Sequence, residues 1–229
     1  MKLSIVIPCY NEEATIKKII QKIKDQKQID KEIIVVDDHS LDGTRSILNN
    51  DLKNDIQKII LNPKNYGKGY SIRMGIKEAT GDFILIQDAD LEYDPSDYEK
   101  LLSPLKNGIA DVVYGSRFIG TSERRVLYFW HTVGNKFLTL LSNIFSNLNL
   151  TDMEVGYKVF KSNVLKGLDL KENRFGFEPE VTAKIAKKNF KIYEVGVKYF
   201  GRKYSEGKKI TWKDGFSAIR CIVKYNLLK

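Results

Sequence analysis

The chain has 229 residues, of which 42% are hydrophobic and 29% charged, and its formal net charge is +9. This composition is typical of a globular protein and excludes a disordered tail or a fibre. The length corresponds to one or two domains and allows a core that needs no disulfide or metal to fold. The positive charge leaves three classes of partner open: nucleic acid, an anionic membrane surface or a phosphorylated small molecule.

The cysteines and the amino terminus both favour a reducing compartment. Cys9 and Cys221 form no CxxC or zinc-ligand spacing, so free thiols are the simplest interpretation. The apolar run at 3–7 is too short for a signal peptide and leads directly into Asn11, which predicts a first strand instead. No run approaches the roughly 18 apolar residues that a membrane-spanning helix needs. We therefore expect a soluble or peripheral protein.

Short apolar runs rich in Ile and Val recur in the first half of the chain, with helical patterns between the early ones. The predicted strands cover residues 3–7, 33–36, 59–61, 83–86 and 112–114, and the predicted helices cover 14–23, 44–48 and 70–79. This alternation predicts an α/β fold with a mostly parallel sheet flanked by helices. Strands in such a sheet end at one common edge, where binding sites lie.

After Arg117 the pattern becomes mainly helical. Residues 126–148 carry an apolar stripe with a period near 3.6, which predicts an amphipathic helix or helix pair. Further helices are predicted at 179–188 and 212–225, with a strand near 192–199. No repeat, low-complexity tract or linker interrupts the sequence, so we expect one domain with a carboxyl-terminal elaboration.

A cluster of carboxylates follows the predicted strand at 83–86. Asp88, Asp90 and Glu92 would share one face if the strand continued, because side chains alternate with a period of two. Clustered oxygen ligands suit Mg²⁺ or Mn²⁺, and such ions complete their coordination with substrate phosphates and water. Ala89 leaves room for a ligand to approach. The alternative is an acidic turn that leads into the next helix.

Other strand ends carry side chains suited to a nucleotide. Tyr10 offers a flat face for a base, Glu12 follows at the same strand end, and Asp38 offers a carboxylate to ribose hydroxyls or a base edge. The segment 65–70 resembles a phosphate-cradling loop but lacks the P-loop spacing, and we interpret it first as a tight turn. No GxGxxG is present, which disfavours a dinucleotide-binding fold.

Two basic features are candidates for binding phosphate. Arg117 follows a strand and two small residues, where a planar guanidinium can clamp a phosphate; a surface ion pair is the alternative. The loop 201–209 is basic and flanked by glycines, so it either closes over a diphosphate or is an ordinary solvated loop. His39 and His131 have no companion ligands nearby in the sequence, and we assign no metal to either.

Four motifs in this order resemble family-2 glycosyltransferases of the GT-A fold, nearest the dolichol-phosphate mannosyltransferase group of polyprenyl-phosphate sugar transferases. They are PCYNE at 8–12, DDHSLDGT at 37–44, DAD at 88–90 and GSR at 115–117. Two weaker similarities to that group are the spacing of Arg202 and Lys208 and the segment TDMEVGYK at 151–158. Glu92 stands where that group often has glutamine. His39 stands where it usually has glycine, which leaves GDP and UDP both open as the nucleotide.

The resemblance implies a single GT-A glycosyltransferase domain over residues 1–229, with a nucleotide-binding half at 1–120 and an acceptor-side elaboration at 121–229. It implies that Asp88, Asp90 and Glu92 bind Mg²⁺ or Mn²⁺. The residues that it assigns to the nucleotide and donor are Pro8, Tyr10, Glu12, Val36, Asp38, Asp88, Ala89, Asp90, Arg117, Arg202 and Lys208.

The mechanism that the resemblance implies is inverting transfer from a nucleotide-diphosphate sugar, with Asp90, Arg117 and Arg202 as catalytic residues. The metal and the basic loop would stabilise the charge that grows on the departing diphosphate. A polyprenyl phosphate acceptor needs no base, because a phosphate monoester with a second pKa of about 6 is already largely anionic. A hydroxyl acceptor needs a carboxylate that acts as a base. Of the candidates we choose Asp152; the others are Glu154, Glu178 and Glu180.

Three functions follow from these observations. The amphipathic segment 126–148 and the positive charge suit a peripheral enzyme at the anionic cytoplasmic face of a membrane, alone or with a membrane subunit or a second copy. Ordinary core packing or a subunit interface is the alternative for that segment.

A sugar hydroxyl in surface-polysaccharide or glycolipid synthesis is the second candidate acceptor. A nucleic-acid-binding module is the third function, but the chain lacks an aromatic-interleaved basic motif, so we expect no nucleic-acid partner.

Overall fold

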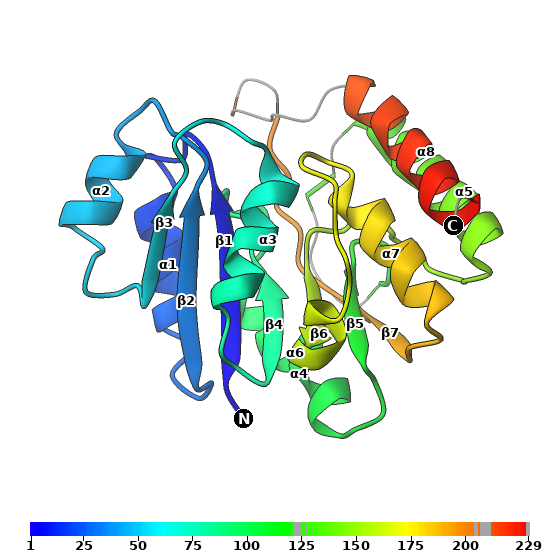
Figure 1. Ribbon diagram of the computed structural model, residues 1–229, viewed down its shortest axis with the longest axis horizontal. Helices are drawn as coiled ribbons and strands as arrows, with labels where there is room; N and C mark the ends of the chain where they lie inside the picture. The colour runs from blue at the N-terminus through cyan, green and yellow to red at the C-terminus, as the bar shows by residue number, and fades with distance from the viewer. Residues whose placement is uncertain (121–124, 127, 204–205, 207–211, 228–229) are drawn as a thin grey trace.

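The computed structural model describes residues 1–120, 125–126, 128–203, 206 and 212–227. At its centre is a seven-stranded sheet with the order β3-β2-β1-β4-β6-β5-β7 (Figure 1). The strands are β1 (Leu3–Cys9), β2 (Lys31–Asp37), β3 (Lys58–Leu61), β4 (Phe83–Ile86), β5 (Val112–Ser116), β6 (Lys158–Lys161) and β7 (Ile192–Gly196). Strand pairs are parallel except those that β6 makes with β4 and β5. The predicted α/β fold with a mostly parallel sheet is confirmed.

Helices cover the sheet and extend beyond one end of it. They are α1 (Ile16–Lys24), α2 (Thr44–Asn50), α3 (Lys68–Glu78), the 3₁₀ turn η1 (Pro95–Asp97), α4 (Tyr98–Lys106), α5 (Phe129–Ser146), α6 (Ser162–Lys166), α7 (Phe177–Lys187) and α8 (Trp212–Leu227). In α1 the isoleucines at 16, 19, 20 and 23 are all fully buried, as a 3.6-residue period requires for one apolar face. The helices predicted from periodicity are present, and their ends differ by a few residues.

The sequence prediction missed β6, the strand that completes the site edge. β6 has only four residues, KVFK, and its Lys158 is fully buried, so the segment has no strand-like apolar pattern. Because β6 runs antiparallel, its first residue, Lys158, pairs with Ile86 of β4 and Tyr114 of β5. The chain just before β6 therefore lies at the edge where β1, β2, β4 and β5 end.

Helix α5 exposes much of the apolar stripe that the sequence analysis identified. Trp130 is 77% exposed, Leu140 58% and Ile144 66%, whereas the buried residues of the helix are Thr139 and Ser142. The hydroxyl of Thr139 accepts a hydrogen bond from the amide of Met153 at 3.1 Å, so the inward face is partly polar. Core packing accounts for the other apolar residues of the helix, such as Leu138 and Leu141.

Helix α8 packs beside α5 and α7, away from β3 (Figure 1). Its Phe216 and Leu227 are 67% and 59% exposed, which extends the exposed apolar surface of α5 onto a second helix. We call this surface the α5/α8 face; its exposed apolar residues are Phe129, Trp130, Val133, Phe137, Leu140, Ile144, Phe216, Val223 and Leu227. Within the described residues, no helix is long and apolar enough to cross a membrane.

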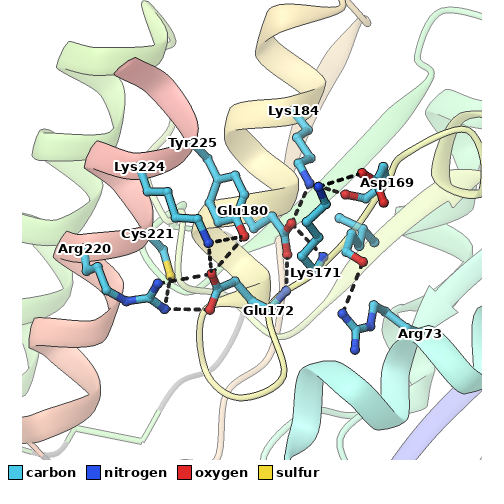
Figure 2. A network of polar contacts seen from close by, with 11 residues as sticks. Arg73, Asp169, Lys171, Glu172, Glu180, Lys184, Arg220, Cys221, Lys224 and Tyr225 are labelled. Carbon is cyan, nitrogen blue, oxygen red and sulfur yellow. Dashed lines mark hydrogen bonds and ion pairs between the residues drawn. The ribbon is translucent and has the colours of Figure 1, made fainter. Parts of the chain in front are cut away.

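The anchor of α8 is Glu172, in the loop between α6 and α7 (Figure 2). Its carboxylate accepts hydrogen bonds from Arg220 at 2.6 Å, Tyr225 at 2.8 Å and Lys224 at 3.1 Å, all from α8. Burial opposes ionisation of Glu172, but these three donors prevail and lower its pKa to about 2. The carboxylate of Glu180 in α7 in turn accepts the backbone amide of Glu172 at 2.8 Å.

The same loop also holds the start of α3. The amide of Tyr70 donates to the carbonyl of Asn173 at 3.0 Å, and Arg73 donates to the Asn173 side chain at 2.6 Å. Gly67, directly before α3, has φ +105, and a Cβ there would collide with the carbonyl oxygen of Asn173. The loop thus connects α8 to the beginning of α3, which borders the site described next.

Candidate active site

A cleft of about 810 Å³ opens at the carboxyl edge of the sheet. Its walls come from the ends of β1, β2, β4 and β5, the start of α3, the segment before β6, and helices α5 and α8. The residues predicted from the sequence that line it are Pro8, Tyr10, Glu12, Asp38, Asp88, Ala89, Asp90, Glu92, Arg117 and Arg202. Strand ends far apart in the sequence thus meet at one place, as parallel strands imply.

Three predicted residues have other positions. Val36 is fully buried within β2, and Asp152 is fully buried against Arg117; neither is among the described residues that line the cleft. Lys208 and part of the predicted basic loop at 201–209 lie outside the described residues. Of that loop, Arg202 is described and reaches the cleft.

Asp88, at the end of β4, is held by a lysine. Its Oδ1 lies 2.8 Å from Nζ of Lys68, which also lies 3.2 Å from Oε1 of Glu178 in α7. Burial opposes the charge on Lys68, but its two carboxylate partners raise the pKa of Lys68 well above its usual value. Lys68 is therefore a permanent positive charge next to the predicted metal ligand, in the segment that we interpreted as a tight turn.

Asp90 is paired with Arg202, whose Nη2 lies 2.9 Å from Asp90 Oδ2. Burial raises the pKa of Asp90, and the neighbouring carboxylates of Asp88 and Glu92 raise it further, against the opposing effect of Arg202. Carboxylates crowded together in this way are stabilised in their ionised form by an additional cation.

β4 does not continue as far as Glu92, so the prediction that the three carboxylates share one face of an extended strand is wrong. β4 ends at Ile86, and Leu91 has φ +65, which breaks the alternation that an extended strand would have maintained. The Glu92 carboxylate instead accepts the backbone amide of Arg202 at 2.8 Å and the hydroxyl of Tyr199 at 3.0 Å. Across the described residues, no three His, Cys, Asp or Glu side chains converge as a metal-ligand set.

Asp88 and Asp90 nevertheless fit a divalent cation that is completed by a substrate. Mg²⁺ commonly binds through one or two carboxylates together with substrate phosphates and water. The two aspartates supply hard oxygen ligands at the cleft, and the raised pKa of Asp90 marks an excess of negative charge there. The donor set therefore suits Mg²⁺ or Mn²⁺ with two protein ligands rather than three.

Asp38 is satisfied within the protein. It is 3% exposed, and its carboxylate accepts the side-chain amide of Asn62 at 2.8 Å and the backbone amides of Tyr66 and Gly67 at 2.9 and 2.7 Å. Two amides of the segment 65–70 thus bind Asp38, which agrees with the interpretation of that segment as a turn. Asp38 borders the cleft and holds this turn beneath it.

The amino-terminal motif and His39 complete this side of the cleft. Tyr10 and Glu12 line it, and the carboxylate of Glu12 accepts the hydroxyl of Thr15 at 2.7 Å and lies 3.6 Å from Arg202. His39 has φ +66, in the left-handed region that glycine adopts most readily. This conformation accounts for the glycine that the resembled family usually has at this position.

Arg117 and Asp152 form a bidentate ion pair. Nε and Nη2 of Arg117 each lie 2.7 Å from a carboxylate oxygen of Asp152, and the Arg117 amide donates to the same carboxylate at 3.0 Å. Arg117 has its ion pair inside the protein rather than at the surface, and it also lines the cleft. Asp152, our choice as a base, is fully buried and contacts Arg117 through both of its carboxylate oxygens.

Several cleft residues were missed or not singled out by sequence reasoning. Arg174 and Tyr199 were not identified as site residues, and Lys68 appeared only within the segment 65–70, which we interpreted first as a tight turn; all three line the cleft. Glu154 and Glu178 were named only as possible bases, and both line the cleft. His131 in α5 also lines it. The similarity of 151–158 to an acceptor-side segment was the available signal for Glu154.

Comparison with known proteins identifies the family. The model of "Glycosyl transferase family 2" matches residues 4–168, more than half of the chain. The chain belongs to glycosyl transferase family 2. Family 2 membership agrees with the resemblance drawn from the four motifs, which all lie within the matched range.

Two curated relatives are similar over nearly the whole chain. A dolichol-phosphate mannosyltransferase from Pyrococcus furiosus is 30% identical, covering 100% of this chain and 64% of its own length. The low-salt glycan biosynthesis hexosyltransferase Agl6 from Haloferax volcanii is also 30% identical, covering 95% of this chain and 52% of its own length. This family 2 chain thus spans between about half and two thirds of the length of these relatives.

Solved structures confirm the GT-A fold. Glucosyl-3-phosphoglycerate synthase from Mycobacterium tuberculosis, in complex with Mn²⁺, UDP and glucosyl-3-phosphoglycerate, superposes with a TM-score of 0.76. The match covers 98% of this chain and 80% of the synthase, at 20% sequence identity. At 20% identity, the similarity to the synthase shows the fold of this family 2 chain and nothing beyond the fold.

Proposed function

We propose that this chain transfers a hexose from a nucleotide-diphosphate sugar to a polyprenyl phosphate at an anionic membrane surface. Mg²⁺ or Mn²⁺, held by Asp88 and Asp90, would neutralise the diphosphate of the donor. Family 2 membership and the similarity to a dolichol-phosphate mannosyltransferase and a hexosyltransferase support the reaction class. We further propose that residues 1–229 act as one domain.

The donor would lie along the sheet edge. Pro8 and Tyr10 at the end of β1 border the part of the cleft suited to the base and ribose. Asp88 and Asp90 follow at the end of β4, the next strand along, beside the cations Lys68 and Arg202. A nucleotide-diphosphate sugar matches this spatial order. Its nucleoside would lie beside the aromatic side chain, and its diphosphate beside the charged groups.

The observation that carries the acceptor proposal is that the cleft joins this charged edge to the α5/α8 face. Trp130, Phe137 and Phe216 line the cleft and are also 77%, 53% and 67% exposed. A polyprenyl phosphate has the matching chemistry, because its phosphate needs cations and its isoprenoid chain needs an apolar wall that leads outward. A small polar acceptor would leave that wall without a use.

Transfer would proceed by a single displacement. An oxygen of the acceptor phosphate attacks the anomeric carbon of the sugar, and the bond from that carbon to the diphosphate oxygen breaks with its electron pair. Arg202 and Lys68 lie where they can stabilise the departing diphosphate, and Arg117, oriented by Asp152, is placed to bind a phosphate. No proton has to be removed from the acceptor, because a phosphate monoester is already largely ionised at neutral pH.

The α5/α8 face would rest on the membrane. Apolar side chains on two adjacent helices, with the exposed Lys136 on α5, suit an interface that binds apolar groups and anionic headgroups together. A cytoplasmic leaflet carries such headgroups. The alternatives are that a second copy of the chain or a separate membrane subunit covers the α5/α8 face. The experiment below separates these alternatives from membrane contact.

The test is transfer to a lipid. The protein is incubated with labelled GDP-mannose or UDP-glucose, Mn²⁺ and polyprenyl phosphate in vesicles that contain anionic lipid, and the label is followed into the organic phase. We expect an organic-soluble, metal-dependent product and co-sedimentation of the protein with the vesicles. A product that forms only in water, on a sugar hydroxyl, would overturn the lipid acceptor. A stable dimer that does not bind vesicles would overturn the membrane contact.

A further inference from the structure

Glu154 lies at the sheet edge in the segment between α5 and β6, and the function proposed above does not use it. Two residues further on, Gly156 abuts the site directly, because a Cβ on Gly156 would collide with the carboxylate of Asp88. The amide of Gly156 donates to the hydroxyl of Tyr93 at 3.1 Å, which fixes this segment against the turn after β4. Glu154 is thus carried by a chain segment packed against the predicted metal site, and it lines the same cleft.

The carboxylate of Glu154 differs from its neighbours in lacking a partner. Its Oε1 is buried and makes no hydrogen bond with the residues that the structure describes. Four neighbouring carboxylates have ion pairs: Asp88 and Glu178 with Lys68, Asp90 with Arg202, and Asp152 with Arg117. Glu154 also lines the cleft, and a buried polar oxygen without a hydrogen bond calls for a partner, which a ligand in the cleft can supply.

The charged groups around Glu154 do not neutralise it. They come from its own segment, from β6, from the end of β5 and from α7, and they are Asp152, Lys158, Arg117 and Glu178. The Nζ of Lys158 donates to the carbonyls of Met153 and Val155, while the guanidinium of Arg117 is bound to Asp152. Burial and the nearby Glu178 therefore raise the pKa of Glu154 well above its usual value.

The position of Glu154 along the edge identifies the part of the donor that it meets. In the strand order β2-β1-β4-β6-β5, the proposed nucleoside end lies at β1 and the diphosphate at β4. Glu154, just before β6, comes next in the same direction. A nucleotide-diphosphate sugar that is bound in this order extends its sugar past Asp88 toward Glu154 and Glu178.

Resting on the proposed function, we infer that Glu154 receives a hydroxyl of the transferred sugar and, together with Glu178, selects an uncharged hexose over a hexuronic acid. A hexose hydroxyl both donates and accepts hydrogen bonds, so it satisfies this carboxyl in either protonation state. A hexuronate would bring a third carboxylate to two that already share a buried site. Like charges at such short range, with little water to screen them, oppose binding and provide the discrimination.

Binding to nucleotides tests this inference without knowledge of the acceptor. Affinities are measured by calorimetry with Mn²⁺ for two matched series: UDP, UDP-glucose and UDP-glucuronate, and GDP, GDP-mannose and GDP-mannuronate. In whichever series binds, we expect the wild type to prefer the hexose over the hexuronate by about tenfold or more, equivalent to about 1.4 kcal/mol. Glu154→Ala should weaken binding of the hexose nucleotide by about tenfold and leave the free diphosphate unchanged, because a hydrogen bond to a charged group is lost.

Glu154→Gln separates charge from hydrogen bonding. It keeps the shape and the hydrogen-bonding capacity of the side chain but removes its charge, so the preference for hexose over hexuronate should narrow. Glu99→Gln serves as the control, because Glu99 lies on α4, its side chain is 44% exposed and paired with Lys106, and it does not line the cleft, so the change should alter none of these affinities.

The possible outcomes separate this inference from the proposed function. If no diphosphate or sugar nucleotide binds the wild type, the proposed function fails. If they bind, but Glu154→Ala changes the affinities for the hexose nucleotide and for the free diphosphate equally, or changes neither affinity, the inference fails while the proposed function stands. If a Glu154 variant keeps its affinity for the donor but loses turnover, Glu154 acts as a base toward the acceptor, and the inference is overturned as well.

Discussion

The guanidinium of Arg202 lies 2.9 Å from the carboxylate of Asp90, although 112 positions separate the two residues in the chain. The residue proposed to hold the donor's phosphates thus neutralises a residue proposed to hold its metal. When a diphosphate with its cation binds, Arg202 can transfer its contact from Asp90 to the phosphates, and the cation can replace it at Asp90. Donor and metal should therefore bind cooperatively, with Mn²⁺ bound more tightly in the presence of a nucleoside diphosphate.

Asp90→Asn should abolish metal-dependent transfer and leave the fold intact. The substitution removes a charged oxygen ligand but keeps the shape of the side chain, and Arg202 retains the carboxylates of Glu12 and Glu92 as partners, so the protein should still fold. Turnover with Mn²⁺ and circular dichroism on the same sample provide the measurement. Near-wild-type turnover would remove Asp90 from the metal site.

Arg202→Ala should reduce turnover more than it weakens binding of the free nucleoside diphosphate. An interaction that strengthens as charge develops on the leaving group acts mainly in the transition state, and loss of one such donor costs about 100-fold in turnover. The measurement compares the fold decrease in kcat with the fold increase in the dissociation constant of the diphosphate. Equal losses in both would mean that Arg202 contributes ground-state binding alone.

Asp152→Ala should destabilise the protein, because it leaves the guanidinium of Arg117 without its partner. Removal of one member of a buried ion pair costs about 3–5 kcal/mol, and Asp152 is fully buried with two 2.7 Å contacts to Arg117. Urea unfolding measures the change in the free energy of unfolding. The smaller change Asp152→Asn should leave the shape of the pH–rate profile unchanged, whereas loss of its acidic limb would indicate that Asp152 is a base after all.

Acid should release α8 through Glu172. The pKa of Glu172 is about 2 in the folded chain against an ordinary 4.5, so the unfolded state binds more protons between these values. The contribution of Glu172 is fully present above about pH 4.5 and is lost as the pH falls toward 2.

Glu172→Gln tests this linkage by removing the acid-dependent contribution. Stability of the variant should be lower than that of the wild type at neutral pH, and the difference should shrink on acidification. Hydrogen exchange of the α8 amides at several pH values provides the local measurement. A difference that stays constant down to pH 2 would contradict the assigned role of Glu172.

Serine substitutions on the α5/α8 face should weaken membrane binding without affecting the donor site. Phe129 and Ile144 are 70% and 66% exposed and do not line the cleft among the described residues. Each change should reduce vesicle binding by about tenfold or more, given about 1.5–3 kcal/mol for burying such a side chain. Leu61→Ser, an exposed apolar residue on β3, is the matched control and should have no effect. Unchanged sedimentation of the Phe129 and Ile144 variants would contradict the membrane contact.

Local patterns in the sequence determined much of the fold. Short apolar runs predicted five of the seven strands, a sixth was expected near 192–199, and the buried isoleucines of α1 follow the expected helical period. Parallel strands must end at one edge, so the residues after β1, β2 and β4 could be assigned to a common cleft before any coordinates were known. The order of the four motifs also sufficed for the family, which the family comparison confirms.

Only the tertiary structure decided which charged side chains are available for chemistry. Asp152 and Glu154 stand two positions apart in the sequence, yet the first is bound by Arg117, while the second lines the cleft and its Oε1 has no hydrogen bond with any described residue. Sequence periodicity likewise showed that α5 is amphipathic but not that Phe129 and Ile144 face outward. Hydrophobic period and turn chemistry act between near neighbours in the chain, whereas ion pairing and burial depend on contacts between residues that folding brings together from far apart.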